Sequence, residues 1–166
     1  MNSSPLTALC PAVVADTWSP VGPRPCLRPK THPGSGLTLS FTLPGDARSA
    51  FVGRTAIAAA LEAHGLAGFV WPATQAVAEL AAVGARMSPG RELYVSLRHR
   101  DEAIRLLVWD QHPRHVEPDV AALCEVRRRR ALWLLAAVVE DWGGEWGTCD
   151  AAQPQVGVKG WAVLPR

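Results

Sequence analysis

The chain has 166 residues, which is enough for one domain with a substantial hydrophobic core and too few for two domains of ordinary size. Hydrophobic residues make up 48% of the chain and charged residues 19%, a composition that excludes disorder of the whole chain. The formal net charge of +2 is too small to indicate a dedicated nucleic-acid binder. Because no stretch reaches the roughly 20 apolar residues of a membrane helix, we expect a soluble protein without a membrane partner.

The N-terminal segment differs in composition from the rest of the chain. Residues 1–36 are rich in proline, with several serines and glycines, and show no hydrophobic periodicity. Such a segment cannot bury enough apolar surface to offset the entropy lost on ordering. We therefore predict a flexible tail over residues 1–36 and a single folded domain over residues 37–166.

The domain is predicted to begin with a strand and a helix. Residues 37–43 alternate apolar and polar side chains, which indicates a strand with one buried face. After a turn, residues 47–65 have a helical pattern that ends at a glycine. The inner face of this helix is predicted to carry Phe51, Ala58 and Leu61.

A second helix and a hairpin are expected next. Pro72 suits a first helical turn, and the helix is predicted to continue to about Arg86 before a Ser-Pro-Gly break. Residues 92–99 and 103–110 are two strand-like runs separated by a short polar turn, which predicts a β-hairpin.

The remaining segments complete an α+β pattern. Residues 111–120 contain two prolines and no useful period, so we predict a loop or lid there. A third helix is predicted over residues 123–142, and residues 160–166 are interpreted as a closing strand. The order of elements predicts a two-layer α/β sandwich in which helices cover one face of a sheet.

The histidines and cysteines do not predict a metal site. His112 and His115 lie in the predicted loop, but the sequence offers no third and fourth ligand at the usual spacing, so we interpret them as loop histidines. The four cysteines form no CxxC pair. We expect them to be reduced and the protein to be cytoplasmic. They are Cys10, Cys26, Cys124 and Cys149.

The ordered succession of segments in the predicted domain resembles a known family. The segments are LSFTLPGDARSAFVGRTAIAAALEAHGL, ATQAVAELAAVGARMSPGRELYVSLRHRDEAIRLLVWD, ALWLLAAVVEDWG and GWAVLPR. Together they are similar to the histidine-kinase-like (GHKL) ATPase domains of actinobacterial anti-sigma-factor serine kinases, over roughly residues 37–166. The resemblance implies a Bergerat-type ATP-binding fold, with a mixed sheet of about five strands and ATP held between the helices and a lid.

The family's Asn box, written E-L-x-x-N-A, matches residues 79–84 of this chain. Glu79 aligns with the family glutamate, so the resemblance implies that it is the general base of a serine/threonine kinase. Val83 stands where the family has the asparagine that helps to hold magnesium. Because magnesium requires oxygen ligands and a valine side chain has none, the resemblance implies ATP as cofactor but leaves no metal ligand in this box.

Two further family positions fall on the second half of the chain. Asp110 aligns with the aspartate that accepts a hydrogen bond from the adenine amino group. Arg129, Arg130 and Ala131 align with the glycine-rich lid, whose backbone amides meet the phosphates in the family. The arginine side chains could still bind a triphosphate, because guanidinium groups match phosphate oxygens. They could equally block the approach that glycine allows.

Three functions therefore remain open from the sequence. The first is an ATP-binding regulatory protein that resembles anti-sigma kinases and binds a protein partner such as a sigma factor or an anti-anti-sigma protein, with a homodimer also compatible. The second is a non-catalytic interaction module of the same fold, with weak or no ATP binding. The third is a nucleic-acid binder using the arginine run 127–130, although the run lacks neighbouring aromatic residues and is more typical of a solvated helix surface.

Overall fold

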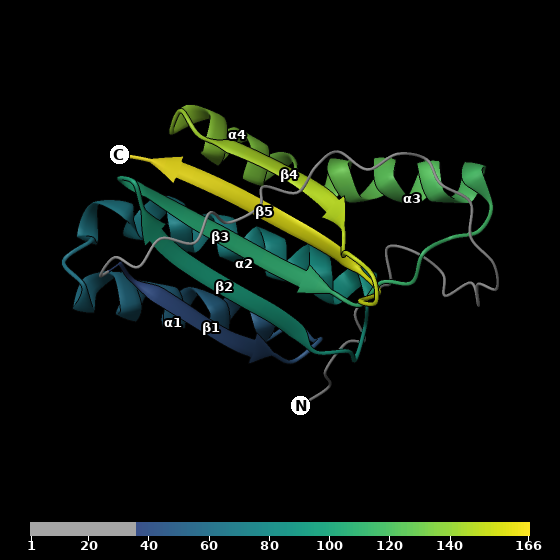
Figure 1. Ribbon diagram of the computed structural model, residues 1–166, viewed down its shortest axis with the longest axis horizontal. Coiled ribbons are helices and arrows are strands. Elements are labelled where there is room, and N and C mark those ends of the chain that lie inside the picture. The colour runs from purple at the N-terminus through teal and green to yellow at the C-terminus, as the bar shows by residue number, and fades with distance from the viewer. Residues whose placement is uncertain (1–35) are drawn as a thin grey trace.

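The computed structural model describes residues 36–166 of the chain. The predicted flexible tail, apart from its last residue, lies outside the described residues. In the described part, one sheet and a layer of helices form the body of the protein (Figure 1). The sheet lies in front in this view and the helices lie behind it, so the prediction of a two-layer α/β arrangement with helices on one face is confirmed.

The sheet has five strands in the order β1-β2-β3-β5-β4. All four neighbouring pairs are antiparallel. The expectation of a mixed sheet is therefore wrong for this chain, because the β2–β3 hairpin and the returning β5 reverse direction at each step. The strands are β1 (Thr38–Leu43), β2 (Leu93–Arg100), β3 (Ala103–Asp110), β4 (Glu145–Asp150) and β5 (Val158–Pro165).

The strands 37–43, 92–99, 103–110 and 160–166 predicted from the sequence are each present within one or two residues. The hairpin turn has a specific backbone reason, since Asp101 and Glu102 both have positive φ, of 53° and 58°. Two consecutive residues in that region form the turn whose twist matches an antiparallel pair. Strand β4 had no prediction of its own, because its residues EWGTCD show no strict alternation.

The helical layer consists of four α-helices and one short 3-10 turn, Ala67–Phe69. The two helices predicted in the first half of the domain are confirmed. The α-helices are α1 (Ser49–Ala63), α2 (Val70–Met87), α3 (Pro118–Ala131) and α4 (Trp133–Asp141). In Figure 1, α1, α2 and α4 lie behind the sheet, whereas α3 lies towards the end of the molecule where β3 and β4 terminate.

The single helix predicted over residues 123–142 is instead two helices. Pro118 begins α3 inside the predicted loop, at a position where a proline costs no hydrogen bond. The two helices meet at Leu132, which has φ −94° and ψ 18° and is 1% exposed. The buried Leu132 thus separates α3 from α4, a boundary that the hydrophobic periodicity of the sequence does not predict.

The inner face of α1 also differs from the prediction. Phe51 is 68% exposed, whereas Gly53, Ile57 and Leu61 are buried at a spacing of four residues. A Cβ atom at Gly53 would lie 3.3 Å from the Leu43 side chain of β1, so the helix lies close to the sheet at this position. The prediction is thus confirmed for Leu61 and wrong for Phe51.

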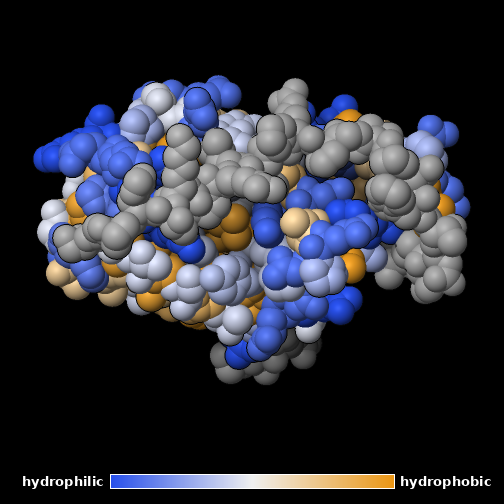
Figure 2. Space-filling view, in the orientation of Figure 1, coloured by the Kyte–Doolittle hydropathy of each residue, from blue (hydrophilic) through white to orange (hydrophobic). Residues whose placement is uncertain are grey.

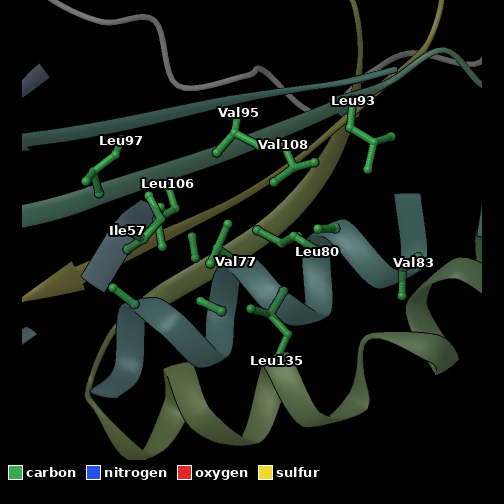
Figure 3. Packing of buried hydrophobic residues seen from close by; sticks show 14 of the residues in the cluster. Ile57, Val77, Leu80, Val83, Leu93, Val95, Leu97, Leu106, Val108 and Leu135 are labelled. Atoms are coloured by element: carbon green, nitrogen blue, oxygen red, sulfur yellow. The ribbon is translucent and has the colours of Figure 1, made fainter. Parts of the chain in front are cut away.

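The hydrophobic core fills the space between the sheet and the helices (Figure 3). In this view, Val95 and Val108 of the sheet lie opposite Val77 and Leu80 of α2. Leu135 of α4 contacts α2 from its other side, so α2 is buried between a strand layer and a helix. Full burial of one such side chain contributes about 1.5–3 kcal/mol.

Figure 2 shows the molecule from the side of the sheet, and where described residues are visible, hydrophilic residues surround smaller hydrophobic areas. None of the helices among residues 36–166 is both long enough and apolar enough to cross a membrane.

Cys149 of β4 is disulfide-bonded, so the expectation of reduced cysteines is wrong at this position.

Candidate functional site

Of the residues to which the family resemblance gave a role, Asp110 lies at the centre of a buried polar cluster, where β3 ends beside the C-terminal end of α2. Asp110 is the last residue of β3 and is only 2% exposed. A side chain at Gly84 of α2 would lie 3.5 Å from the Cβ atom of Asp110. Ser88, directly after α2, donates a hydrogen bond of 3.4 Å to Oδ1 of Asp110.

Arg128 of α3 forms a buried ion pair with Asp110. Its Nη1 donates to Oδ2 at 2.5 Å, and its Nη2 donates to Oδ1 at 3.2 Å. Arg128 is 5% exposed. The backbone N–H of His112 also donates to Oδ1, at 3.0 Å. Two charged groups can be buried at this depth only because each satisfies the other, and the pair therefore acts as one unit.

This geometry bears directly on the adenine role that the resemblance implied for Asp110. Both carboxylate oxygens already accept hydrogen bonds from Arg128, and the side chain is shielded from solvent. Because Asp110 is 2% exposed, an adenine amino group could reach it only if the residues that cover it moved. The sequence reasoning did not single out Arg128, because it is one of four consecutive arginines that look alike in the sequence.

The residues aligned with the lid glycines do not form a loop. Arg129, Arg130 and Ala131 lie in the last turn of α3. Arg129 is exposed, and its guanidinium carbon lies 6.0 Å from the centre of the Trp146 ring, a cation–π contact. Helical amides already donate within the helix, so they cannot cradle phosphates as lid amides do.

Glu79 and Val83 do not join Asp110 in one open site. Val83 is 4% exposed and belongs to the hydrophobic core. Glu79 is half-buried, and it lies five residues before Gly84, about 7.5 Å further along the axis of α2. Burial raises the pKa of the Glu79 carboxyl above its usual value of 4.5, and the nearby Arg54 partly opposes this.

The raised pKa of Glu79 predicts how the stability of the fold changes with pH. A carboxyl whose pKa is raised in the folded state contributes stability below the unfolded pKa, and this contribution is lost as the pH rises through the folded pKa. Glu79→Gln should therefore gain stability relative to the wild type as the pH rises from about 4 to about 7. Urea unfolding of both proteins at the two pH values measures the change, and a difference that stays constant with pH would contradict the shift.

A cluster of histidines and a cysteine lies next to the ion pair. His112 Nε2 is 3.1 Å from His115 Nε2 and 3.2 Å from Cys124 Sγ. His112 Nδ1 donates to the Met87 carbonyl at 2.9 Å. Burial lowers the pKa of His112 below its usual value, and the charge of Arg128 acts in the same direction, whereas the hydrogen bond to Met87 opposes the shift.

The sequence interpretation of His112 and His115 missed this cluster. It treated them as isolated loop histidines because no third ligand stood at the usual spacing, but α3 brings Cys124 to them. The sequence does contain one indication that Cys124 and Arg128 lie side by side. They are four residues apart, so they share a face of any helix through this segment.

Comparisons with known proteins do not assign a family. No protein-family model matches the chain. A search of curated proteins likewise gives no significant match.

Proposed function

We propose that this chain is a non-catalytic regulatory protein with a GHKL-like sandwich, and that it acts by binding a protein partner. The observation that carries the proposal is the buried pair of Asp110 and Arg128. In the fold that the sequence resembles, the aspartate is needed to read adenine, and here an arginine from the same chain accounts for both of its oxygens. The chain thus supplies internally the hydrogen bonds that a nucleotide would supply in an active relative.

Two other features support the same proposal. Val83 offers no oxygen ligand to magnesium and is buried in the core. The residues aligned with the lid are helical, so the backbone does not present the amides that bind phosphates. Nucleotide binding would require changes at all three places together.

The partner surface that we favour lies on the outer side of α1 and the start of α2. Phe51 is 68% exposed and Trp71 is 54% exposed. Phe51 also lines a groove with a volume of about 330 Å³ between the two helices, together with Ala58 and Val70. Exposed aromatic side chains beside a groove are typical anchors of protein–protein interfaces.

The resemblance suggests the class of partner. Sigma factors and anti-anti-sigma proteins are the partners of the anti-sigma kinases, so we propose a partner of one of these two kinds.

A second candidate function is ATP binding with Glu79 as general base. The raised pKa of Glu79 favours it, because a carboxyl that holds its proton more tightly is a better base near neutral pH. The two candidates differ in whether the purified chain binds nucleotide.

Calorimetric titration of ATP into the full chain, with and without magnesium, separates the candidates. We expect no binding up to millimolar ATP in either condition. Binding that Glu79→Gln leaves intact and that Asp110→Asn abolishes would instead support the nucleotide site and contradict our proposal. Because Asp110→Asn also disturbs the buried pair, its folding must be verified by circular dichroism in the same preparation.

Photo-crosslinking in cells that produce the chain tests the proposed binding of a protein partner. A photo-crosslinking phenylalanine analogue at Phe51 should capture one distinct protein without added nucleotide, and the same analogue at the exposed Val156 should not. Binding of that protein to the purified chain should then be weakened at least tenfold by Phe51→Asp. Equal capture at both positions, or capture of only a second copy of the chain, would contradict the proposed surface.

A further inference from the structure

Three metal-ligating atoms converge between the loop after β3 and helix α3. They are His112 Nε2, His115 Nε2 and Cys124 Sγ, and they all lie within 4.8 Å of one another. His112 and Cys124 are 4% and 6% exposed, whereas His115 is half-buried. The cluster is thus closed towards the core and reached from the side of His115.

The hydrogen bond at the far side of His112 fixes the state of its ring. A carbonyl oxygen can only accept, so Nδ1 of His112 must carry the proton that it donates to Met87. In the neutral ring Nε2 then has a single lone pair, directed at the cluster. A histidine ligand of a metal is oriented in the same way, with its other ring N–H held by a backbone carbonyl.

The other two ligand atoms lie close to this lone pair. His115 Nε2 and Cys124 Sγ are 3.1 and 3.2 Å from His112 Nε2. A cation between the three atoms could accept a lone pair from each of them.

We propose that His112, His115 and Cys124 bind one zinc ion, with water as the fourth ligand. Two imidazole nitrogens and one thiolate suit zinc and do not suit magnesium or calcium, which take oxygen ligands. Zinc–nitrogen bonds of about 2.0 Å and a zinc–sulfur bond of about 2.3 Å place tetrahedral ligand atoms about 3.3–3.6 Å apart. The two separations to His112 Nε2, 3.1 and 3.2 Å, are a few tenths of an ångström shorter than these values, and the separation between His115 Nε2 and Cys124 Sγ is at most 4.8 Å. Zinc binding would therefore require the three side chains to adjust around the ion.

The charges around the cluster are compatible with a bound zinc ion. As the zinc–sulfur bond forms, Cys124 loses its thiol proton to the buffer, so the ion and its ligands carry one net positive charge. The neighbouring Arg128 would repel this charge, but its own charge is balanced by Asp110 at 2.5 Å. Asp110 also orders the start of the loop through the backbone N–H of His112.

The zinc ion would tie α3 to the rest of the domain. Within α3, Cys124 and Arg128 are the buried residues, so both of the buried side chains of this helix belong to the cluster and the neighbouring ion pair. Zinc would link the middle of α3 to the loop after β3, and through His112 to the end of α2. The position of α3 would then depend on the metal.

Titration of zinc into the full chain, in competition with a chromophoric chelator, tests the proposal. We expect one tightly bound ion per chain, and at least a tenfold loss of affinity in both Cys124→Ser and His115→Ala. The exposed His64, whose ring forms a hydrogen bond with the Ala60 carbonyl of the same helix end, supplies the matched control, and His64→Ala should bind as the wild type does. These variants avoid His112, whose loss would also remove the hydrogen bond to Met87.

Cobalt provides a direct readout of the ligands. Co²⁺ bound through Cys124 should give a thiolate-to-cobalt charge-transfer band, which Cys124→Ser should abolish and His64→Ala should retain. The proposal is overturned if the chain binds no zinc, or if Cys124→Ser and His115→Ala bind it as tightly as the wild type. Neither result depends on nucleotide or partner binding.

Discussion

Arg128→Met is expected to destabilise the fold by about 3–5 kcal/mol, although it changes one arginine in a run of four. The substitution keeps most of the apolar stem of the side chain but removes the guanidinium that donates to both oxygens of Asp110. Asp110 would then be a buried carboxylate with only the His112 N–H and the Ser88 hydroxyl as donors. Urea unfolding of the variant and the wild type measures the loss.

Two controls make the result specific to the buried pair. Arg127→Met changes the exposed neighbour and should alter stability by less than about 0.5 kcal/mol. The double variant Arg128→Met with Asp110→Leu removes both charges and should recover most of the lost stability, because no charge is left buried alone. If Arg128→Met and Arg127→Met were equally mild, Arg128 would not be bound to Asp110 in solution.

Ile57→Ala is expected to destabilise the domain by about 2–5 kcal/mol, whereas Phe51→Ala on the same helix should cost less than about 0.5 kcal/mol. Ile57 is 0% exposed and lies in the core between α1 and the sheet, so its truncation leaves a cavity. Phe51 is 68% exposed and loses little contact when it is truncated. Parallel urea unfolding of the two variants compares the two faces of α1 directly.

The Phe51→Ala variant also tests whether the exposed face of α1 binds the proposed partner. If Phe51 serves the proposed partner surface, Phe51→Ala should weaken partner capture while leaving the unfolding midpoint almost unchanged. The reverse ranking, with Phe51→Ala the more destabilising variant, would mean that α1 is rotated about its axis relative to the face described above.

The periodic part of the fold could be predicted from residues alone. Alternation over residues 37–43 predicted β1, and two strand-like runs around a polar turn predicted the β2–β3 hairpin. Turn, proline and glycine signals at their ends predicted α1 and α2. The resemblance added the expectation of five strands. Its expectation of a mixed sheet was wrong, since the antiparallel pairing of β5 with β3 depends on where the chain returns after β4.

The errors fall where tertiary contacts override a local pattern. The helix pattern over residues 123–142 is continuous in the sequence, and burial of Leu132 divides it. Phe51 looked like a core residue because of its hydrophobicity, but the buried face of α1 carries Gly53, Ile57 and Leu61 instead. Neither choice can be made without knowing which element lies opposite.

The candidate site shows the same division. The sequence by itself determined which polar residues are available and that Val83 cannot bind magnesium, since both depend only on side-chain chemistry. Only the tertiary structure decided that Arg128, and not its three neighbours, lies on Asp110, and that Cys124 meets His112 and His115. These residues are between 9 and 18 positions apart in the chain. Their contacts depend on how α3 lies across the end of β3, which no local pattern specifies.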